Sequence, residues 1–286
     1  MLFHVATLLQ YKVDFPSTLI ISVHAQRNAS QTIAEEHFAI EPRVRYSEFA
    51  TEGTGNRFVR IETGRRRQLA IEYKAAVECD FRMLTARRLE ATPVAALSGT
   101  QLNHLFPSRY CQSDRLGRLA WDLFGKIANR YDQVVAISDW IHDNVEYVRG
   151  STDSGTSAYD TVTQRTGVCR DFAHLGIALC RALNIPARYF TGYAYQLDPP
   201  DMHACFECFI GGNWMVFDAT RLAHLNGLVR VAVGRDAAEA SVASVFGSVR
   251  LQSMVVSCTL GAGQRFKALP RQKLKRVGVA LPTRRG

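Results

Sequence analysis

The sequence predicts an α+β protein, in which a β-rich N-terminal domain precedes a domain that combines helices with an antiparallel sheet. Short β-type runs separated by turn signals occupy roughly the first 91 residues. Three helical patterns, followed by strand-like runs, occupy residues 114–262. Helices followed by antiparallel strands are typical of an α+β domain. With 286 residues, the chain also exceeds the usual size of one domain, roughly 100–200 residues.

The N-terminal domain is predicted to span residues 1–91 and to close as a β-sandwich or an open barrel. Apolar and polar side chains alternate clearly over residues 68–78, as expected of a half-buried strand. Further β-type runs cover residues 19–23, 37–40 and 58–62. Residues 92–113 contain two prolines and a glycine and show no sustained period, which indicates a linker.

The second domain is predicted to span residues 114–262 and to begin with helices. Ser113 is placed to cap the first of them. Apolar residues at helical spacing mark the first two helices: Leu116, Leu119 and Leu123, then Val134, Ile137, Ile141, Val145 and Val148. A third helix is predicted over residues 168–183. Strand-like runs follow at residues 188–195, 203–210, 214–220 and 253–260.

Cys169 lies at the point where a loop becomes the third helix. A thiol at a helix N-terminus is exposed to the positive end of the helix dipole, which lowers its pKa and makes thiolate available. Gly167 would permit a substrate backbone to approach, and the Cys169 N–H could help to hold an oxyanion. A small buried structural cysteine, the interpretation favoured for Cys180, is the alternative for Cys169. Whether Cys169 is a nucleophile or a structural cysteine depends on the residues that accompany it.

His203 and Asp218 are the predicted partners, and both lie on strands that follow the helix. A two-residue turn at Gly211-Gly212 would pair position 205 with Asp218 and place Asp218 diagonal to His203 on one face. The carboxylate could then hold the imidazole and stabilise its cation. A three-residue loop would turn Asp218 to the other face, in which case Glu207, on the His203 face, is the alternative carboxylate.

Several segments together resemble the bacterial transglutaminase-like superfamily over about residues 107–220. The segments are Asp139-Trp140-Ile141, Val145-Glu146-Tyr147, residues 165–175, residues 181–189, Gly192-Tyr193, His203-Ala204 and Phe217-Asp218-Ala219-Thr220. The resemblance implies a papain-like core with a Cys169–His203–Asp218 triad that acts at amide carbonyls by hydrolysis or by transfer to an amine. The family usually has tryptophan where Cys205 stands here, so the substrate is not carried over.

Other features of the motif region are given structural roles. Cys205-x-x-Cys208 has the spacing of a zinc half-site, but two such sulfurs on a strand point to opposite faces, and no second cysteine pair accompanies them. Residues expected only to support the site or to pack the core are Arg170, Asp171, His174, Tyr193 and Trp214. No metal and no organic cofactor is therefore expected.

Charge and composition restrict the remaining function classes. The net charge of +9 is concentrated in a predicted basic tail, residues 263–286, which carries eight positive charges and no acid. The rest of the chain is nearly neutral, which argues against a nucleic-acid-binding protein, and the tail is expected to be a solvated extension. Seven scattered cysteines suggest reduced thiols. Without an apolar run long enough to cross a membrane, a cytoplasmic location is expected.

The functional hypothesis is a thiol-dependent acyl-transfer enzyme that forms a thioester on Cys169. Its partner would be a peptide or protein substrate with an acyl-donor amide. Hydrolysis is favoured because water requires no second substrate pocket. The alternatives are a transamidating transglutaminase and a non-catalytic module that binds peptides in the same cleft. The sequence does not determine the oligomeric state.

Overall fold

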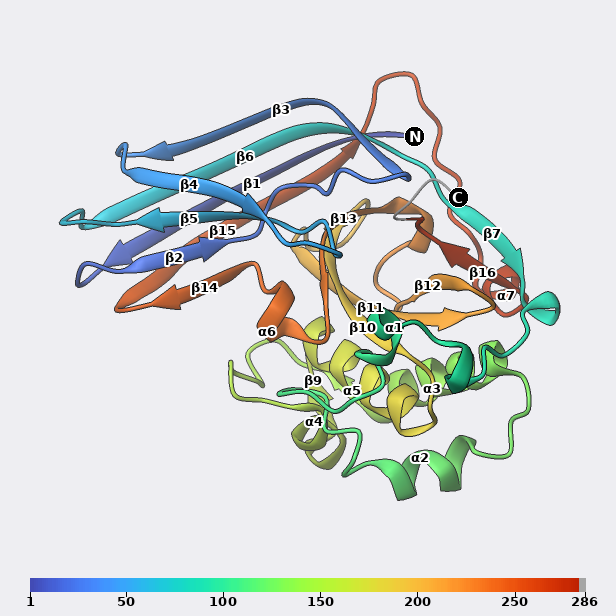
Figure 1. Cartoon of the computed structure of the whole chain (residues 1–286). Helices are drawn as coiled ribbons and strands as arrows, with labels where there is room; N and C mark the ends of the chain where they lie inside the picture. Colours follow the sequence, from blue (N-terminus) through green and yellow to red (C-terminus); the bar gives the residue numbers. More distant parts are fainter. Residues whose placement is uncertain (283–286) are drawn as a thin grey trace.

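The β-rich part of the protein is a sandwich of two four-stranded antiparallel sheets (Figure 1). The computed structural model describes residues 1–282, with Arg88 described for its backbone only. In the first sheet the strand order is β15-β1-β6-β3, and the strands are β1 (Leu2–Val13), β3 (Gln31–Glu41), β6 (Gln68–Cys79) and β15 (Val249–Leu260). In the second the order is β14-β2-β5-β4, with β2 (Thr18–Ile21), β4 (Arg45–Ala50), β5 (Arg57–Glu62) and β14 (Ala243–Phe246).

Alternation of apolar side chains explains why these strands face one another. In β6 the predicted alternation is confirmed, since Leu69, Ile71, Tyr73 and Val77 are at most 2% exposed. Their neighbours Gln68, Lys74 and Glu78 are exposed. Each sheet therefore buries one face against the other, and the prediction of a β-sandwich is confirmed.

The α+β part of the protein is built on a six-stranded sheet of order β13-β10-β11-β12-β16-β7. Its strands are β7 (Arg82–Thr85), β10 (Ala187–Ala194), β11 (Met202–Ile210), β12 (Asn213–Phe217), β13 (Leu228–Gly234) and β16 (Val277–Ala280). Helix α5 (Cys169–Ala182) packs on β11 at Gly176, where a Cβ atom would come within 2.7 Å of the Phe206 ring. Only a residue without a side chain allows this close approach, so Gly176 sets the distance between helix and sheet.

The remaining helices lie on the same side of this sheet as α5 or connect its strands (Figure 1). They are α1 (Gly99–Leu102), α2 (Gly117–Phe124), α3 (Arg130–Asn144), α4 (Ala158–Gln164), α6 (Ala237–Ala240) and α7 (Arg271–Leu274). A parallel pair, β8 (Glu146–Tyr147) and β9 (Thr166–Gly167), precedes α5. The prediction for α2 is corrected: it begins at Gly117 without a cap from Ser113, and it buries Ala120 and Phe124 while Leu123 is 43% exposed.

Strand pairing crosses the predicted domain boundaries at both ends. Strands β14 and β15, assigned from sequence to the second domain, complete the two sheets of the sandwich. Strand β7, which precedes residue 91, pairs with β16 in the six-stranded sheet. The sandwich therefore includes two strands from the C-terminal half of the chain, and the six-stranded sheet includes one strand from the N-terminal region.

The prediction of a solvated tail is wrong for residues 263–282. Helix α7 and strand β16 lie within this segment, and the Tyr131 hydroxyl donates to the carbonyl oxygens of Leu274 and Val277 at 2.6 and 2.9 Å. Arg271 pairs with Asp139 at 2.9 Å. The tail residues Arg284 and Arg285 lie outside the described part of the chain. No helix within residues 1–282 is long and apolar enough to cross a membrane.

Candidate active site

Cys169 is the first residue of α5, and its side chain is partly exposed. The preceding Val168 has an extended backbone and donates its N–H to the Asp171 carboxylate at 2.9 Å, which caps the helix. An acid in this position also complements the positive end of the helix dipole. The thiol therefore lies at the beginning of this helix, as predicted, and the helix has 14 residues.

Asp171 fixes the start of α5 from several directions. Its buried carboxylate accepts hydrogen bonds from the Thr152 hydroxyl at 2.6 Å and from Nη2 of Arg170 at 2.9 Å. A Cβ atom on Gly167 would lie only 2.8 Å from the Asp171 Cβ. Gly167 therefore allows close packing against Asp171.

The hairpin between β11 and β12 has the predicted register. Gly211 and Gly212 both have positive φ, at 57° and 77°, and Ile210 pairs with Asn213 across a two-residue turn. Left-handed conformations at both turn positions favour glycine. The pairing places position 205 opposite Asp218, which directly follows β12, and leaves His203 diagonal to it. The prediction that His203 and Asp218 share a face is confirmed.

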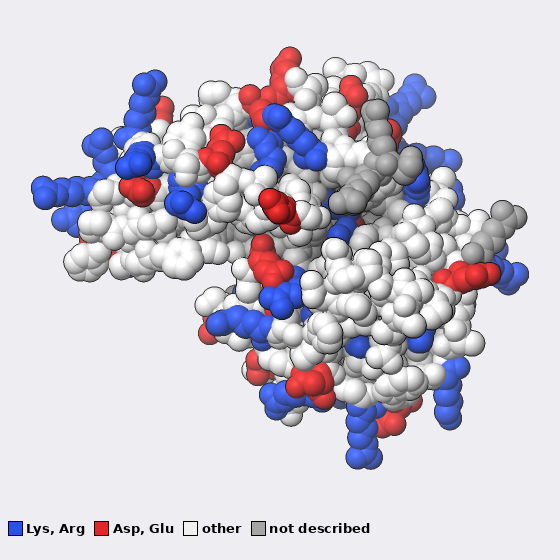
Figure 2. All heavy atoms as spheres, viewed as in Figure 1, with Lys and Arg blue, Asp and Glu red and all other residues white. Residues whose placement is uncertain are grey.

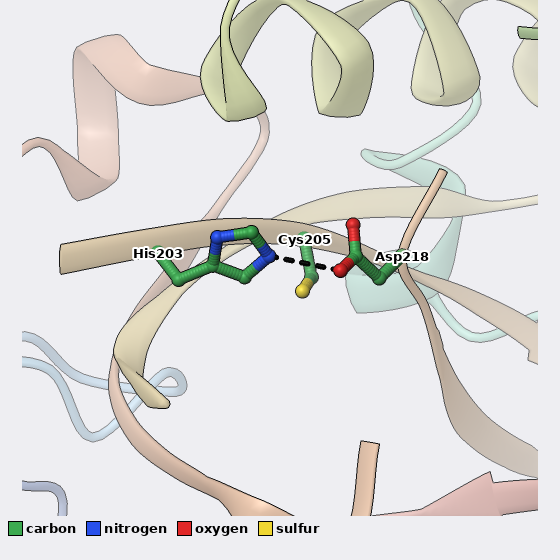
Figure 3. A group of neighbouring side chains, drawn as sticks. All are labelled: His203, Cys205 and Asp218. Atoms are coloured by element: carbon green, nitrogen blue, oxygen red, sulfur yellow. Dashed lines mark hydrogen bonds and ion pairs between the residues drawn. The ribbon is translucent and has the colours of Figure 1, made fainter. Parts of the chain in front are cut away.

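His203 and Asp218 are joined by a hydrogen bond of 3.0 Å between Nε2 and Oδ2 (Figure 3). The Asp218 carboxylate also accepts from the backbone N–H and hydroxyl of Thr220 at 2.9 and 2.7 Å, and from the Ala223 N–H at 3.0 Å. Four donors fix the carboxylate in its ionised form. Asp218 holds a proton on Nε2 of the imidazole, and Figure 3 shows the other ring nitrogen, Nδ1, turned away from it.

The electrostatics of this pair favour an imidazolium beside a carboxylate. Burial acts to lower the pKa of His203, but the negative charge of Asp218 and hydrogen bonds to Asp218 and Cys169 raise it well above its ordinary value. Burial acts to raise the pKa of Asp218, but the charge of His203 and hydrogen bonds from His203, Thr220 and Ala223 lower it. The buried imidazole can therefore carry a proton at neutral pH.

Tyr147 is a site residue to which the sequence analysis gave no role. Burial raises the pKa of its phenol, and the charge of the neighbouring Cys169 raises it further. The Tyr147 phenol therefore lies near both Cys169 and His203, whose charges act on its pKa. Tyr147 belongs to Val145-Glu146-Tyr147, one of the segments that resemble the family, and this membership could have identified it as a site residue.

Cys205 lies between His203 and Asp218 (Figure 3), and its sulfur and the ligand atoms of the other two residues are within 4.8 Å of one another. Burial raises the pKa of the Cys205 thiol to about 12, so it stays protonated. These three residues could approach one metal ion, but the four donors around Asp218 already occupy its carboxylate. Cys208 instead faces Cys180, with 3.5 Å between the sulfurs, which confirms that the two cysteines of the C-x-x-C segment lie on opposite faces.

Glu207, the alternative orienting carboxylate, belongs to a separate ion cluster. It accepts a hydrogen bond from Nε of Arg188 at 2.7 Å and pairs with Arg230. Burial would raise the pKa of Glu207, but the two guanidinium groups keep it below its usual value. The Arg188 guanidinium also lies over the half-buried Trp214 ring, with its central carbon 4.1 Å from the ring centroid. Glu207 therefore binds the two arginines of this cluster and is not a hydrogen-bond partner of His203.

A cavity of about 390 Å³ lies behind Asp218, between α3, the loop after β12 and the C-terminal segment. Its lining includes the apolar side chains of Tyr131, Phe217 and Leu269. The loop that forms one wall, residues 218–225, also supplies the Thr220 and Ala223 donors to Asp218. The segment predicted to be a solvated tail therefore contributes to the surroundings of the candidate triad.

Comparison with known proteins identifies two family regions in the chain. Residues 118–219 match the model of the transglutaminase-like superfamily, and residues 1–100 match that of the bacterial transglutaminase N-terminal domain. A crystal structure from Cytophaga hutchinsonii, described as a "putative cysteine protease", is 51% identical and has a TM-score of 0.94. That match covers 98% of this chain and 97% of the other.

Curated relatives match over shorter stretches. An uncharacterized protein of Mycobacterium leprae is 32% identical over 111 residues, which are 36% of this chain and 40% of that protein. An uncharacterized protein of Mycobacterium tuberculosis is 42% identical over 60 residues, or 21% of this chain and 19% of that protein. The chain thus matches less than half the length of these two relatives, but nearly all of the crystallised protein.

Proposed function

The chain belongs to the transglutaminase-like superfamily, and on that premise we propose that it is a thiol-dependent enzyme that hydrolyses amide bonds in peptides or proteins. The observation that carries the proposal is the 3.0 Å hydrogen bond between His203 and Asp218, beside a thiol at the start of α5. Hydrolysis is further supported by the crystallised relative, 51% identical, whose description refers to a protease.

In the proposed reaction Asp218 keeps the Nε2 proton in place, and Nδ1 of His203 takes the proton of the Cys169 thiol. The thiolate attacks the amide carbonyl carbon, and the imidazolium then gives its proton to the leaving amine as the C–N bond breaks. A thioester on Cys169 remains. Water, deprotonated by His203, attacks this thioester, which releases a carboxylic acid and restores the thiol.

Tyr147 is proposed as a second donor to the oxyanion that forms at the carbonyl oxygen. The substrate oxygen would accept a hydrogen bond from the Cys169 N–H, and the hydroxyl of the neighbouring Tyr147 would donate to the same oxygen. Removing one such donor typically costs about 10²–10³-fold in kcat. Tyr147→Phe should therefore lower kcat and leave folding intact, and an unchanged kcat would assign the hydroxyl a packing role.

Hydrolysis of fluorescently labelled casein, with and without a dansylated alkylamine, tests the reaction type. Wild-type protein should release peptides in the presence of EDTA, and Cys169→Ala should release none. Incorporation of the amine without peptide release would establish transamidation, the activity that the description of the N-terminal family model suggests. Retained binding of casein with no turnover in either assay would identify a peptide-binding module.

A further inference from the structure

Four short connections, called hairpins here, lie together at the end of the β-sandwich that points away from the six-stranded sheet (Figure 1). At each of them the chain turns back from one sheet into the other. Each joins a strand of one sheet to a strand of the other: β14 to β15, β1 to β2, β5 to β6 and β3 to β4. Connected strands occupy the same position in the order of their two sheets. The four hairpins therefore form one row, in the order in which they are named above. We call residues 12–18, 41–45, 62–68 and 245–251 the hairpin end.

The first two hairpins of the row expose large apolar side chains. Phe15 is 70% exposed and Phe246 is 64% exposed. The hairpins that carry them are neighbours, because the Asp14 N–H donates to the Ser248 carbonyl oxygen at 3.0 Å. Single exposed apolar residues are ordinary, but two phenylalanines at adjoining tips form a protruding apolar pair.

The hairpin end is also strongly basic. It contains seven basic residues and three acidic ones, a net charge of +4, whereas the whole chain carries +9. The basic residues are Lys12, Arg43, Arg45, Arg65, Arg66, Arg67 and Arg250, all exposed. One of the acids, Asp14, is already paired with Arg250 at 3.0 Å. Figure 2 shows Lys and Arg side chains gathered over this end of the molecule, at the left of the view.

We propose that the hairpin end docks on the surface of an anionic phospholipid bilayer. The arginines would contact lipid phosphates, while Phe15 and Phe246 enter the boundary between headgroups and acyl chains. Electrostatic attraction combined with insertion of apolar side chains is the general mode of peripheral membrane binding. An acidic polypeptide would satisfy the arginines but would leave the two phenylalanines in water, so the bilayer fits both features.

The proposal is tested by co-sedimentation of the full chain with vesicles of phosphatidylcholine alone or mixed in equal amounts with phosphatidylglycerol. Wild-type protein should bind the mixed vesicles, bind the neutral ones weakly, and dissociate at high salt. Arg43→Gln combined with Arg65→Gln should weaken binding roughly fivefold per residue. Phe15→Ser combined with Phe246→Ser should weaken it by roughly tenfold or more.

Matched control variants test whether position matters. Phe106, 58% exposed, and Arg118, with a side chain 96% exposed, lie outside the hairpin end, so Phe106→Ser and Arg118→Gln should bind as wild type. Every variant should melt as wild type and keep its peptidase activity on a soluble substrate. Absence of binding to the mixed vesicles would overturn the proposal. Binding lost with the arginines but unaffected by the phenylalanine changes would also overturn it, and would indicate an acidic polypeptide as partner.

Discussion

Replacing Glu207 by glutamine separates the role of this carboxylate from that of Asp218. Glu207 is fully buried and lies between Arg188, whose side chain is 9% exposed, and Arg230, which is fully buried. Burial lowers the pKa of Arg230 to about 10, so its guanidinium remains charged at neutral pH. The substitution would leave two buried cations without their common counter-charge, and breaking a buried pair in this way costs about 3–5 kcal/mol.

A loss of this size corresponds to a fall in Tm of roughly 6–20 °C, at about 2–4 °C per kcal/mol for a chain of this length. Thermal unfolding followed by circular dichroism measures it. Below the transition, kcat/KM of Glu207→Gln on a peptide substrate should equal that of wild type, because Glu207 does not contact His203. As a control, Glu48→Gln removes a carboxylate that is half exposed and 3.9 Å from Arg57, and should cost at most about 1 kcal/mol.

The pH dependence of stability gives a second measure of the same interaction. The pKa of Glu207 is lowered in the folded state, so its stabilising contribution is present above the ordinary glutamate pKa and is lost as the pH falls through the folded value. Glu207→Gln should remove this part of the acid destabilisation. The reasoning is refuted if Glu207→Gln melts as wild type and is inactive, because Glu207 would then act on the imidazole.

Three further predictions concern the triad. Cys169→Ala should lower kcat/KM to background and His203→Ala nearly as far, whereas Asp218→Asn should keep the highest residual activity; equal activity in all three variants would contradict the assigned roles. Because Asp218 raises the pKa of His203, the alkaline limb of the kcat/KM profile should move to lower pH in Asp218→Asn, and an unmoved limb would show that the carboxylate does not support the imidazolium. Iodoacetamide should modify Cys169 before Cys258, since burial raises the pKa of Cys258 to about 12, and peptide mapping that finds the reverse order would count against Cys169 as nucleophile.

Local sequence signals were sufficient to predict the strand register that brings His203 and Asp218 together. Two adjacent glycines define a two-residue turn, and strand alternation then determines which side chains share a face with His203. The register found between β11 and β12 agrees with this reasoning. The donors that fix Asp218, Thr220 and Ala223, could not be predicted in the same way, because they depend on the path of an irregular loop.

Long-range pairings were the part of the fold that the sequence did not reveal. Strands β14 and β15 join partners more than 200 residues earlier in the chain, and no local periodicity encodes such a choice. Strand β16 is only four residues long and lies in a segment whose basic composition suggested a solvated tail. The hairpin end was missed for a related reason: a net charge averages over a domain, whereas folding concentrated seven basic residues at four tips.

The central claim, a thioester formed on Cys169 with the help of His203, is tested most directly by intact-protein mass spectrometry during turnover of an activated peptide ester. Wild-type protein should gain the mass of one acyl group within the mixing time, and peptide mapping should locate it on Cys169. His203→Ala should acylate far more slowly, and Cys169→Ala should not be acylated. Peptide hydrolysis that proceeds undiminished in Cys169→Ala, or an acyl group found on another cysteine, would contradict the account.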